Sequence, residues 1–182
     1  VSASCAKQED QKAPITKPQI KIEGDRLTPE GLWAMGRIGS VAADIETGWL
    51  AYTVSYYSVE ENRSTTWIRV CNPFTENGEL DVFDEFVGYD PAWFGASGWL
   101  AFMRGGQLYL RRDGKEVMVE GANNIDGFLL SPMRDKVILV KQIKTVETTQ
   151  DKYPDLPLAT GHMHEDLMYK HWDEWVETAP QP

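Results

Sequence analysis

The sequence predicts an all-β protein of antiparallel strands, because one strand motif recurs and each copy is followed by a second strand-like run. GWLAY at 48–52 returns as GWLAF at 98–102, and the runs TTWIRV at 65–70 and QLYLRR at 107–112 follow the two copies. Repetition of a strand with its partner is typical of stacked or radially repeated β units. The tryptophans of the two copies are 50 residues apart, close to the roughly 40–45 residues of a four-stranded propeller blade. The sequence therefore predicts β-propeller blades.

A third, weaker copy of the motif extends the expected partial propeller to about three blades over residues 27–182. DKVILVK at 135–141 begins 37 positions after Gly98, the start of the second copy. The polar turns ADIETG, FGASG and SPMRD precede the three apolar runs, and such residues favour hairpin connections. Closed propellers have about four to eight blades, so three blades would leave sheet faces bare. We expect a fragment of a longer protein, a truncated product, or a chain capped by another copy of itself.

Residues 1–26 are expected to form a disordered tether, because the segment is polar, interrupted by prolines and without periodicity. Small residues precede Cys5 and charged residues follow it. This pattern resembles the end of a bacterial lipoprotein signal, in which the cysteine is lipidated, and AKQED resembles an export tag of Bacteroidetes lipoproteins. Lipidation of Cys5 would place the protein in the bacterial envelope, in the periplasm or anchored to the outer membrane. The alternative is an ordinary leader with an incidental cysteine.

A short helix is expected at the start of the ordered part. Thr28 suits the N-cap and Pro29 the first helical position. Trp33 contributes to an apolar side, and Gly36 and Gly39 are expected to end the helix.

About ten short strands are expected after this helix. Alternation of inward and outward side chains, which indicates a strand, is clearest at 50–57 and is followed by a hairpin connection at 60–64. Asp113 and Gly114 give the strongest hairpin signal in the chain. Cys71 is expected to be a small buried side chain, not a disulfide partner of Cys5. Further strands are expected from Val41 and at 67–71, 80–86, 91–94, 107–110, 116–119, 128–130 and 136–143.

The segment EDLMYKHWDEWVE at 165–177 predicts an amphipathic helix that ends before Pro180. Its apolar side consists of Leu167, Met168, His171, Trp172, Trp175 and Val176.

Composition excludes several classes of function. The chain has 42% hydrophobic residues and seven tryptophans, sufficient for a packed core. It has no apolar stretch of the roughly 20 residues that cross a bilayer, so membrane attachment is expected only through a lipid on Cys5. A formal net charge of −10 argues against nucleic acid, which requires clustered lysine and arginine.

Three segments carry a resemblance to a known family: LTPEGLWAMGRIGSVAADIETGWLAYTVSYYSVEENRS at 27–64, GQLYLRRDGK at 106–115 and DLPLATGHMHEDLMYKHWDEWV at 155–176. They resemble the amino-terminal part of secreted bacterial serine peptidases of the prolyl oligopeptidase family, in the dipeptidyl-peptidase and acylaminoacyl-peptidase branch. The resemblance implies a propeller of seven or eight blades followed by an α/β-hydrolase domain. The SPDGK turn of that family survives only as SPMRDK at 131–136.

No catalytic triad is expected in this chain. An α/β-hydrolase needs GxSxG followed by an aspartate and a histidine, and the nearest match, GASG at 95–98, lacks the spacer before its last glycine. Ser97 is therefore interpreted as a turn serine.

Two acidic residues are the candidates for substrate binding. The resemblance implies that carboxylates projecting from the propeller hold the free amino terminus of a peptide, a role that Asp173 and Glu174 could perform through charge-assisted hydrogen bonds. The alternative is a solvated helix face. No cofactor is expected. The spacing of His162, His164 and His171 matches no zinc signature, so packed or surface histidines are expected and no metal.

The sequence thus predicts a non-catalytic propeller segment of a secreted serine exopeptidase, which screens and positions short peptides for a hydrolase domain outside this chain. The alternative is a non-catalytic propeller-like binding module of the bacterial envelope that has no hydrolase at all.

Overall fold

The structure is a computed structural model that describes residues 12–20, 24–76, 78–95, 98–158, 160–163 and 177–182. The chain divides into two compact units, 1–93 and 94–182. The predicted helix at 165–177 lies, apart from its last residue, outside the described residues.

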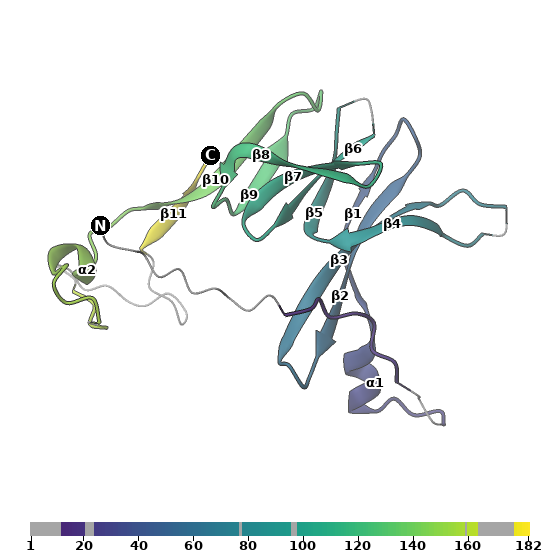
Figure 1. Ribbon diagram of the computed structural model, residues 1–182, viewed down its shortest axis with the longest axis horizontal. Coiled ribbons are helices and arrows are strands. Elements are labelled where there is room, and N and C mark those ends of the chain that lie inside the picture. The colour runs from purple at the N-terminus through teal and green to yellow at the C-terminus, as the bar shows by residue number, and fades with distance from the viewer. Residues whose placement is uncertain (1–11, 21–23, 77, 96–97, 159, 164–176) are drawn as a thin grey trace. The chain divides into compact units, whose positions relative to one another are not determined.

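The first sheet contains four strands in the order of the chain, β1-β2-β3-β4 (Figure 1). Each neighbouring pair is antiparallel. The long register between β2 and β3, from Leu50 opposite Cys71 to Ser58 opposite Arg63, makes this hairpin the centre of the unit. The strands are β1 (Arg37–Ala43), β2 (Leu50–Ser58), β3 (Arg63–Asn72) and β4 (Asp81–Val87).

The second and third sheets repeat this order of strands. The second runs β5-β6-β7-β8, and the third places β10 between β9 and β11. The copies of the repeated motif lie in β2, β6 and β10, so each copy contributes the second strand of its sheet. The strands are β5 (Tyr89–Phe94), β6 (Trp99–Arg104), β7 (Gln107–Arg112), β8 (Lys115–Asn123), β9 (Gly127–Leu130), β10 (Val137–Lys144) and β11 (Thr178–Gln181).

The predicted all-β class is confirmed at the level of antiparallel sheets with little helix. The described residues form no closed sheet. Two elements have no counterpart in the sequence prediction, the single-turn helix α2 (Thr149–Lys152) and β11. Pro180, expected to follow a helix, lies opposite Gln142 in β11, an edge strand where a residue without an N–H is tolerated.

The helix α1 (Pro29–Ala34) begins as predicted. Thr28 is its N-cap, and the Thr28 hydroxyl accepts a hydrogen bond of 3.1 Å from the Gly31 N–H. The helix ends at Ala34, and Gly36, which follows its C-cap Met35, lies close to β2. A Cβ on Gly36 would lie 2.7 Å from Cε1 of Tyr56 and 2.8 Å from Cγ2 of Val54. The absence of a side chain therefore allows β1 to start at Arg37, earlier than the sequence predicted.

The hairpin between β7 and β8 forms where Asp113 and Gly114 predict it. Both residues have positive φ, 50° and 74°, and Arg112 lies opposite Lys115 in the register. These features identify the two-residue type I′ turn that the right-handed twist of antiparallel strands favours.

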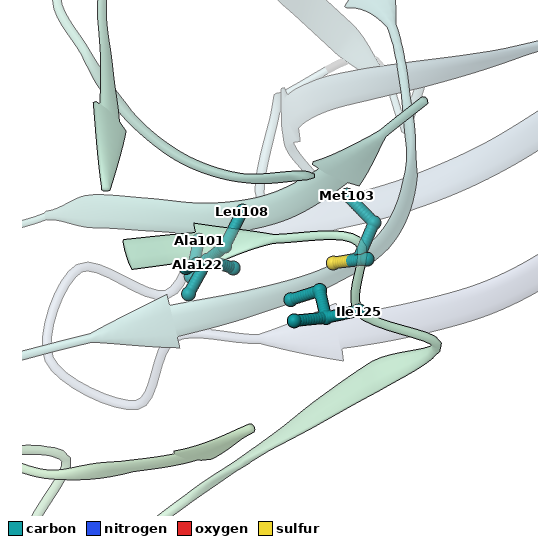
Figure 2. Close-up of a cluster of buried hydrophobic side chains, with 5 residues drawn as sticks. All are labelled: Ala101, Met103, Leu108, Ala122 and Ile125. Atoms are coloured by element: carbon teal, nitrogen blue, oxygen red, sulfur yellow. The ribbon is translucent and has the colours of Figure 1, made fainter. Parts of the chain in front are cut away.

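Each unit has its own cluster of buried apolar side chains. In the first unit, Ile15, Val54 and Tyr56 pack with the partly buried Trp67. In the second unit, the buried cluster is formed by Ala101, Met103, Leu108, Ala122 and Ile125 (Figure 2). Ile15 belongs to the expected tether, yet it is only 9% exposed, so burial in the first unit extends beyond the predicted boundary at residue 27.

Candidate binding site

A pocket of about 670 Å³ in the first unit is the candidate site. Three segments line it: residues 13–20, which we call the strap, the helix α1, and residues 57–61 at the turn between β2 and β3. Figure 1 shows the strap running past β2 and β3 toward α1. The pocket volume is within the range of about 300–1,000 Å³ that ligand sites occupy. We call this cavity the strap pocket.

The strap is held by three side chains of β3. The Ile15 N–H donates to Oγ1 of Thr65 at 2.9 Å, and Nε1 of Trp67 donates to the Ile15 carbonyl at 2.7 Å. The Arg63 guanidinium donates to the Ala13 carbonyl at 2.6 Å. Alternate residues of a strand project from the same face of its sheet, so Arg63, Thr65 and Trp67 form a row that binds the strap through its backbone atoms.

Aromatic side chains form the opposite wall of the strap pocket. Trp33 projects from α1, and its ring centroid lies 4.9 Å from that of Tyr57 at the end of β2. The Arg37 guanidinium lies 5.0 Å from the Trp33 ring centroid, within the range of a cation–π interaction. The Tyr57 hydroxyl also donates to Oδ1 of Asn62. These contacts connect the helix, the first strand and the turn.

Within the described ranges, the charged side chains that line the strap pocket are Glu30, Glu60 and Glu61, which are all acidic. Glu61 forms a salt bridge of 2.8 Å with Arg63, the residue that also binds the strap. Glu30 and Glu60 form no ion pair within the described part of the chain. A lining that combines apolar side chains with carboxylates favours a ligand that combines positive charge with apolar surface.

The residues predicted to bind substrate or lipid are not among those that the structure describes. Asp173, Glu174 and Cys5 lie outside the described ranges, and so does Ser97. Their roles remain predictions. The structure therefore neither brings these residues together nor separates them.

Of the three histidines, only His162 lies in the described ranges. Its Nδ1 is 3.0 Å from Oε1 of Glu177, and both side chains are about one-third exposed. His164 and His171 are outside the described ranges. Within those ranges no group of three histidine, cysteine or acidic side chains could hold a metal ion.

Cys71 is a free cysteine that is fully buried in β3. Burial raises the pKa of its thiol, and the nearby Asp81 carboxylate adds to this effect. A buried thiol with a raised pKa is a poor nucleophile, which agrees with the predicted role of Cys71 as a small apolar side chain.

The strap and its pocket were not predicted from the sequence. The segment shows neither strand alternation nor helical periodicity. This is because its backbone forms hydrogen bonds with side chains of β3 and does not pair with the backbone of a neighbouring strand. One signal was present: Ile15 and Ile20 are spaced apolar residues within a polar, proline-containing segment. Such spacing is compatible with docking on another element, although it does not reveal which one.

Two curated proteins are similar to most of this chain. It is 39% identical over 167 residues to dipeptidyl-peptidase 5 of Porphyromonas gingivalis, an alignment that covers 87% of this chain and 24% of that protein. It is 29% identical over 173 residues to dipeptidyl-peptidase 5 of Porphyromonas endodontalis, with 89% and 24% covered. The chain is therefore related to dipeptidyl peptidases. It spans about a quarter of the length of the curated relatives it matches.

No family model and no solved structure gives a significant match to the chain. Within the described residues no helix has the length and apolar character required to span a membrane.

Proposed function

We propose that this chain is the propeller portion of a secreted dipeptidyl peptidase of the prolyl oligopeptidase family. The observation that carries the proposal is the 39% identity over 87% of the chain to dipeptidyl-peptidase 5. In this proposal the chain carries no catalytic residue. It screens short peptides and positions them for a hydrolase domain that lies outside the 182 residues.

The arrangement of the sheets supports the propeller part of the proposal. Three successive sheets have their strands in the order of the chain, and the repeated motif occupies the second strand of each one. A propeller is a radial repetition of four-stranded sheets of this kind. Two sheets have four strands and the third has three, which is consistent with two complete blades and one incomplete blade.

Asp173 and Glu174 are the residues proposed to bind the peptide. A carboxylate pair can accept charge-assisted hydrogen bonds from a protonated amino terminus. In the longer protein that contains this chain, D173N/E174Q is expected to raise KM for dipeptide-yielding substrates by about tenfold while changing kcat less, because the lost contacts are made to the substrate and not to the reacting bond. An unchanged KM would contradict this assignment, and E76Q serves as a control.

The sequence of the gene beyond Pro182 is a direct test of the proposal. A GxSxG motif followed by an aspartate and then a histidine is expected there. A chromogenic dipeptidyl substrate should be cleaved by the longer protein and not by the 182-residue chain alone. A stop codon with no partner gene, or activity of the chain alone, would overturn the proposal, and the former result would favour a non-catalytic binding module of the envelope.

Lipidation of Cys5 is the proposed basis for localisation in the bacterial envelope. Metabolic labelling with a lipid precursor, compared between the unaltered protein and C5S, tests this point. Loss of label in C5S is expected, and an equally labelled or equally unlabelled pair would exclude Cys5 as the attachment site.

A further inference from the structure

We propose that the strap pocket binds a short extended peptide in which a lysine or arginine lies next to proline and other apolar residues. The site belongs entirely to the first unit and needs no hydrolase domain. The inference is therefore independent of the proposed peptidase role.

The first reason for this proposal is the apolar lining of the pocket. Its walls contain Pro14, Pro18, Pro29, Val59 and the aromatic rings of Trp33 and Tyr57. Grooves lined by aromatic side chains recognise extended proline-containing peptides, because such peptides lose little conformational entropy on binding. The volume of about 670 Å³ suits a few residues of an extended chain.

The second reason for this proposal is the charge of the residues that line the pocket. Among the residues that the structure describes, no lysine or arginine lines the pocket, whereas Glu30, Glu60 and Glu61 do. Glu61 is already paired with Arg63, which leaves Glu30 and Glu60 for a cation on the ligand. The net charge of −10 also attracts a positively charged partner.

The contact between Arg37 and Trp33 shows that an aromatic ring of this wall accepts a cation. The guanidinium lies 5.0 Å from the ring centroid. A basic side chain of a bound peptide can use Trp33 or Tyr57 in the same way, and this interaction is strongest where water is excluded.

The strap is both a wall of the pocket and the element that the ligand would stabilise. In the part of the chain that the structure describes, its backbone is hydrogen-bonded to the side chains of Arg63, Thr65 and Trp67. Because the docked strap is part of the lining, undocking of the strap removes one wall of the pocket. A ligand that binds only the docked strap must shift the strap toward this state. Peptide binding and protection of the Ile15 N–H are therefore expected to occur together.

The experiment uses the full chain and three fluorescein-labelled, amidated peptides of sequence Leu-Pro-X-Pro-Leu, with lysine, norleucine or glutamate at X. Fluorescence anisotropy measures their affinity. We expect the lysine peptide to bind at least tenfold more tightly than the glutamate peptide, with the norleucine peptide between them. Equal affinities, or no binding of the lysine peptide at millimolar protein, would overturn the proposal.

Two variants separate the contributions of charge and strap. E30Q/E60Q is expected to weaken the lysine peptide about three- to tenfold and to leave the norleucine peptide unchanged. E46Q is the matched control, because Glu46 is exposed in the turn at the other end of β2, and it should bind like the unaltered chain. Loss of affinity for both peptides in E30Q/E60Q, or no loss for either, would contradict the assigned role of the carboxylates.

I15D removes the apolar contact that docks the strap while leaving β2 and β3 in place. It is expected to weaken the lysine peptide at least tenfold with an unchanged circular dichroism spectrum. In the unaltered chain, hydrogen exchange at the Ile15 N–H is expected to slow severalfold when the lysine peptide is added. Full affinity in I15D, or unaltered exchange at a saturating concentration of peptide, would overturn the coupling between strap and ligand.

Discussion

The first and second sheets share a strand order but differ in what surrounds the repeated motif. In the first sheet, β3 presents Arg63, Thr65 and Trp67 to the strap. In the second sheet, the equivalent strand β7 faces β8 with an ion-pair cluster, in which Glu116 lies 2.5 Å from Arg104 and 2.9 Å from Arg111. The first sheet also has a cross-strand ion pair, between Arg69 of β3 and Glu85 of β4. The row that binds the strap is therefore the feature that distinguishes the first copy of the repeat.

The difference lies in the side chains and not in the order of the strands, which is the same in both sheets. The strands β3 and β7 are each paired on both sides, so their side chains can differ without loss of the sheet. The cluster in the second sheet is satisfied internally: Arg104 also lies 4.4 Å from the Tyr109 ring centroid, and its hydrogen bond to Glu116 raises the pKa of its guanidinium. The row in the first sheet instead binds atoms outside the sheet, which is the property of a recognition surface.

The largest expected effect comes from the buried cluster of the second unit. Leu108 is 2% exposed in β7, and L108A should destabilise this unit by about 2–5 kcal/mol, because it removes transfer energy and leaves a cavity. Hydrogen exchange resolved by residue measures the change. Exchange is expected to accelerate in β6–β8 and to stay constant in β2 and β3; acceleration in both units would show that the two sheets unfold together.

The second-largest effect on stability is expected at Gly36, the glycine that follows α1 in the first unit. G36A introduces a Cβ within 3 Å of Tyr56 and Val54. The strain of such overpacking costs about 1–3 kcal/mol, so thermal unfolding of the first unit should occur at a lower temperature. G127A is the control for an added methyl group, because a Cβ on Gly127 would have no atom within 4 Å and the residue has no positive φ. A G36A variant as stable as the unaltered chain would contradict the close contact.

The strands and turns could be predicted from the sequence because their signals are local. Alternation located β2, and Asp113 with Gly114 located the β7–β8 turn, since the conformations these residues favour match the local structure. The repeat also identified the equivalent positions of β2, β6 and β10, a relation that the sheet order confirms.

The elements that the sequence did not predict depend on contacts between distant residues. Gly36 suggested only the end of a helix, whereas its closest neighbours are side chains some 20 residues further along the chain, in β2. β11 exists because Thr178 to Gln181 pair with β10, a pairing that no periodicity in four residues can indicate. The strap pocket was missed for the same reason, since Ile15 meets Thr65 at a separation of 50 residues.

A smaller effect is expected at the strap, the feature that the second sheet lacks. W67F removes the 2.7 Å hydrogen bond to the Ile15 carbonyl but keeps an aromatic ring in the cluster. The loss is about 0.5–1.5 kcal/mol, the typical net contribution of a single hydrogen bond. Limited proteolysis should cleave the strap about two- to tenfold faster. W99F in the second sheet is the matched control, and equal cleavage rates for W67F and the unaltered chain would show that this bond does not hold the strap.

The smallest effect on stability is expected at the third sheet. Its strands contain no fully buried residue, and the neighbouring helix α2 is held by polar contacts. The Asp151 carboxylate accepts hydrogen bonds from the Lys144 ammonium, the Thr148 N–H and the Thr148 hydroxyl, and these contacts lower the pKa of Asp151 from 3.8 to about 2. A lowered pKa means that the contacts favour the folded state fully above pH 4, and that this contribution is lost as the pH falls from about 4 toward 2. The carboxyl resonance of Asp151, followed by NMR, should titrate near pH 2. In D151N the protection factors of the α2 amides, which correct for the intrinsic pH dependence of exchange, should become independent of pH over this interval. A midpoint near 3.8 would show that the contacts of Asp151 with Lys144 and Thr148 do not stabilise α2.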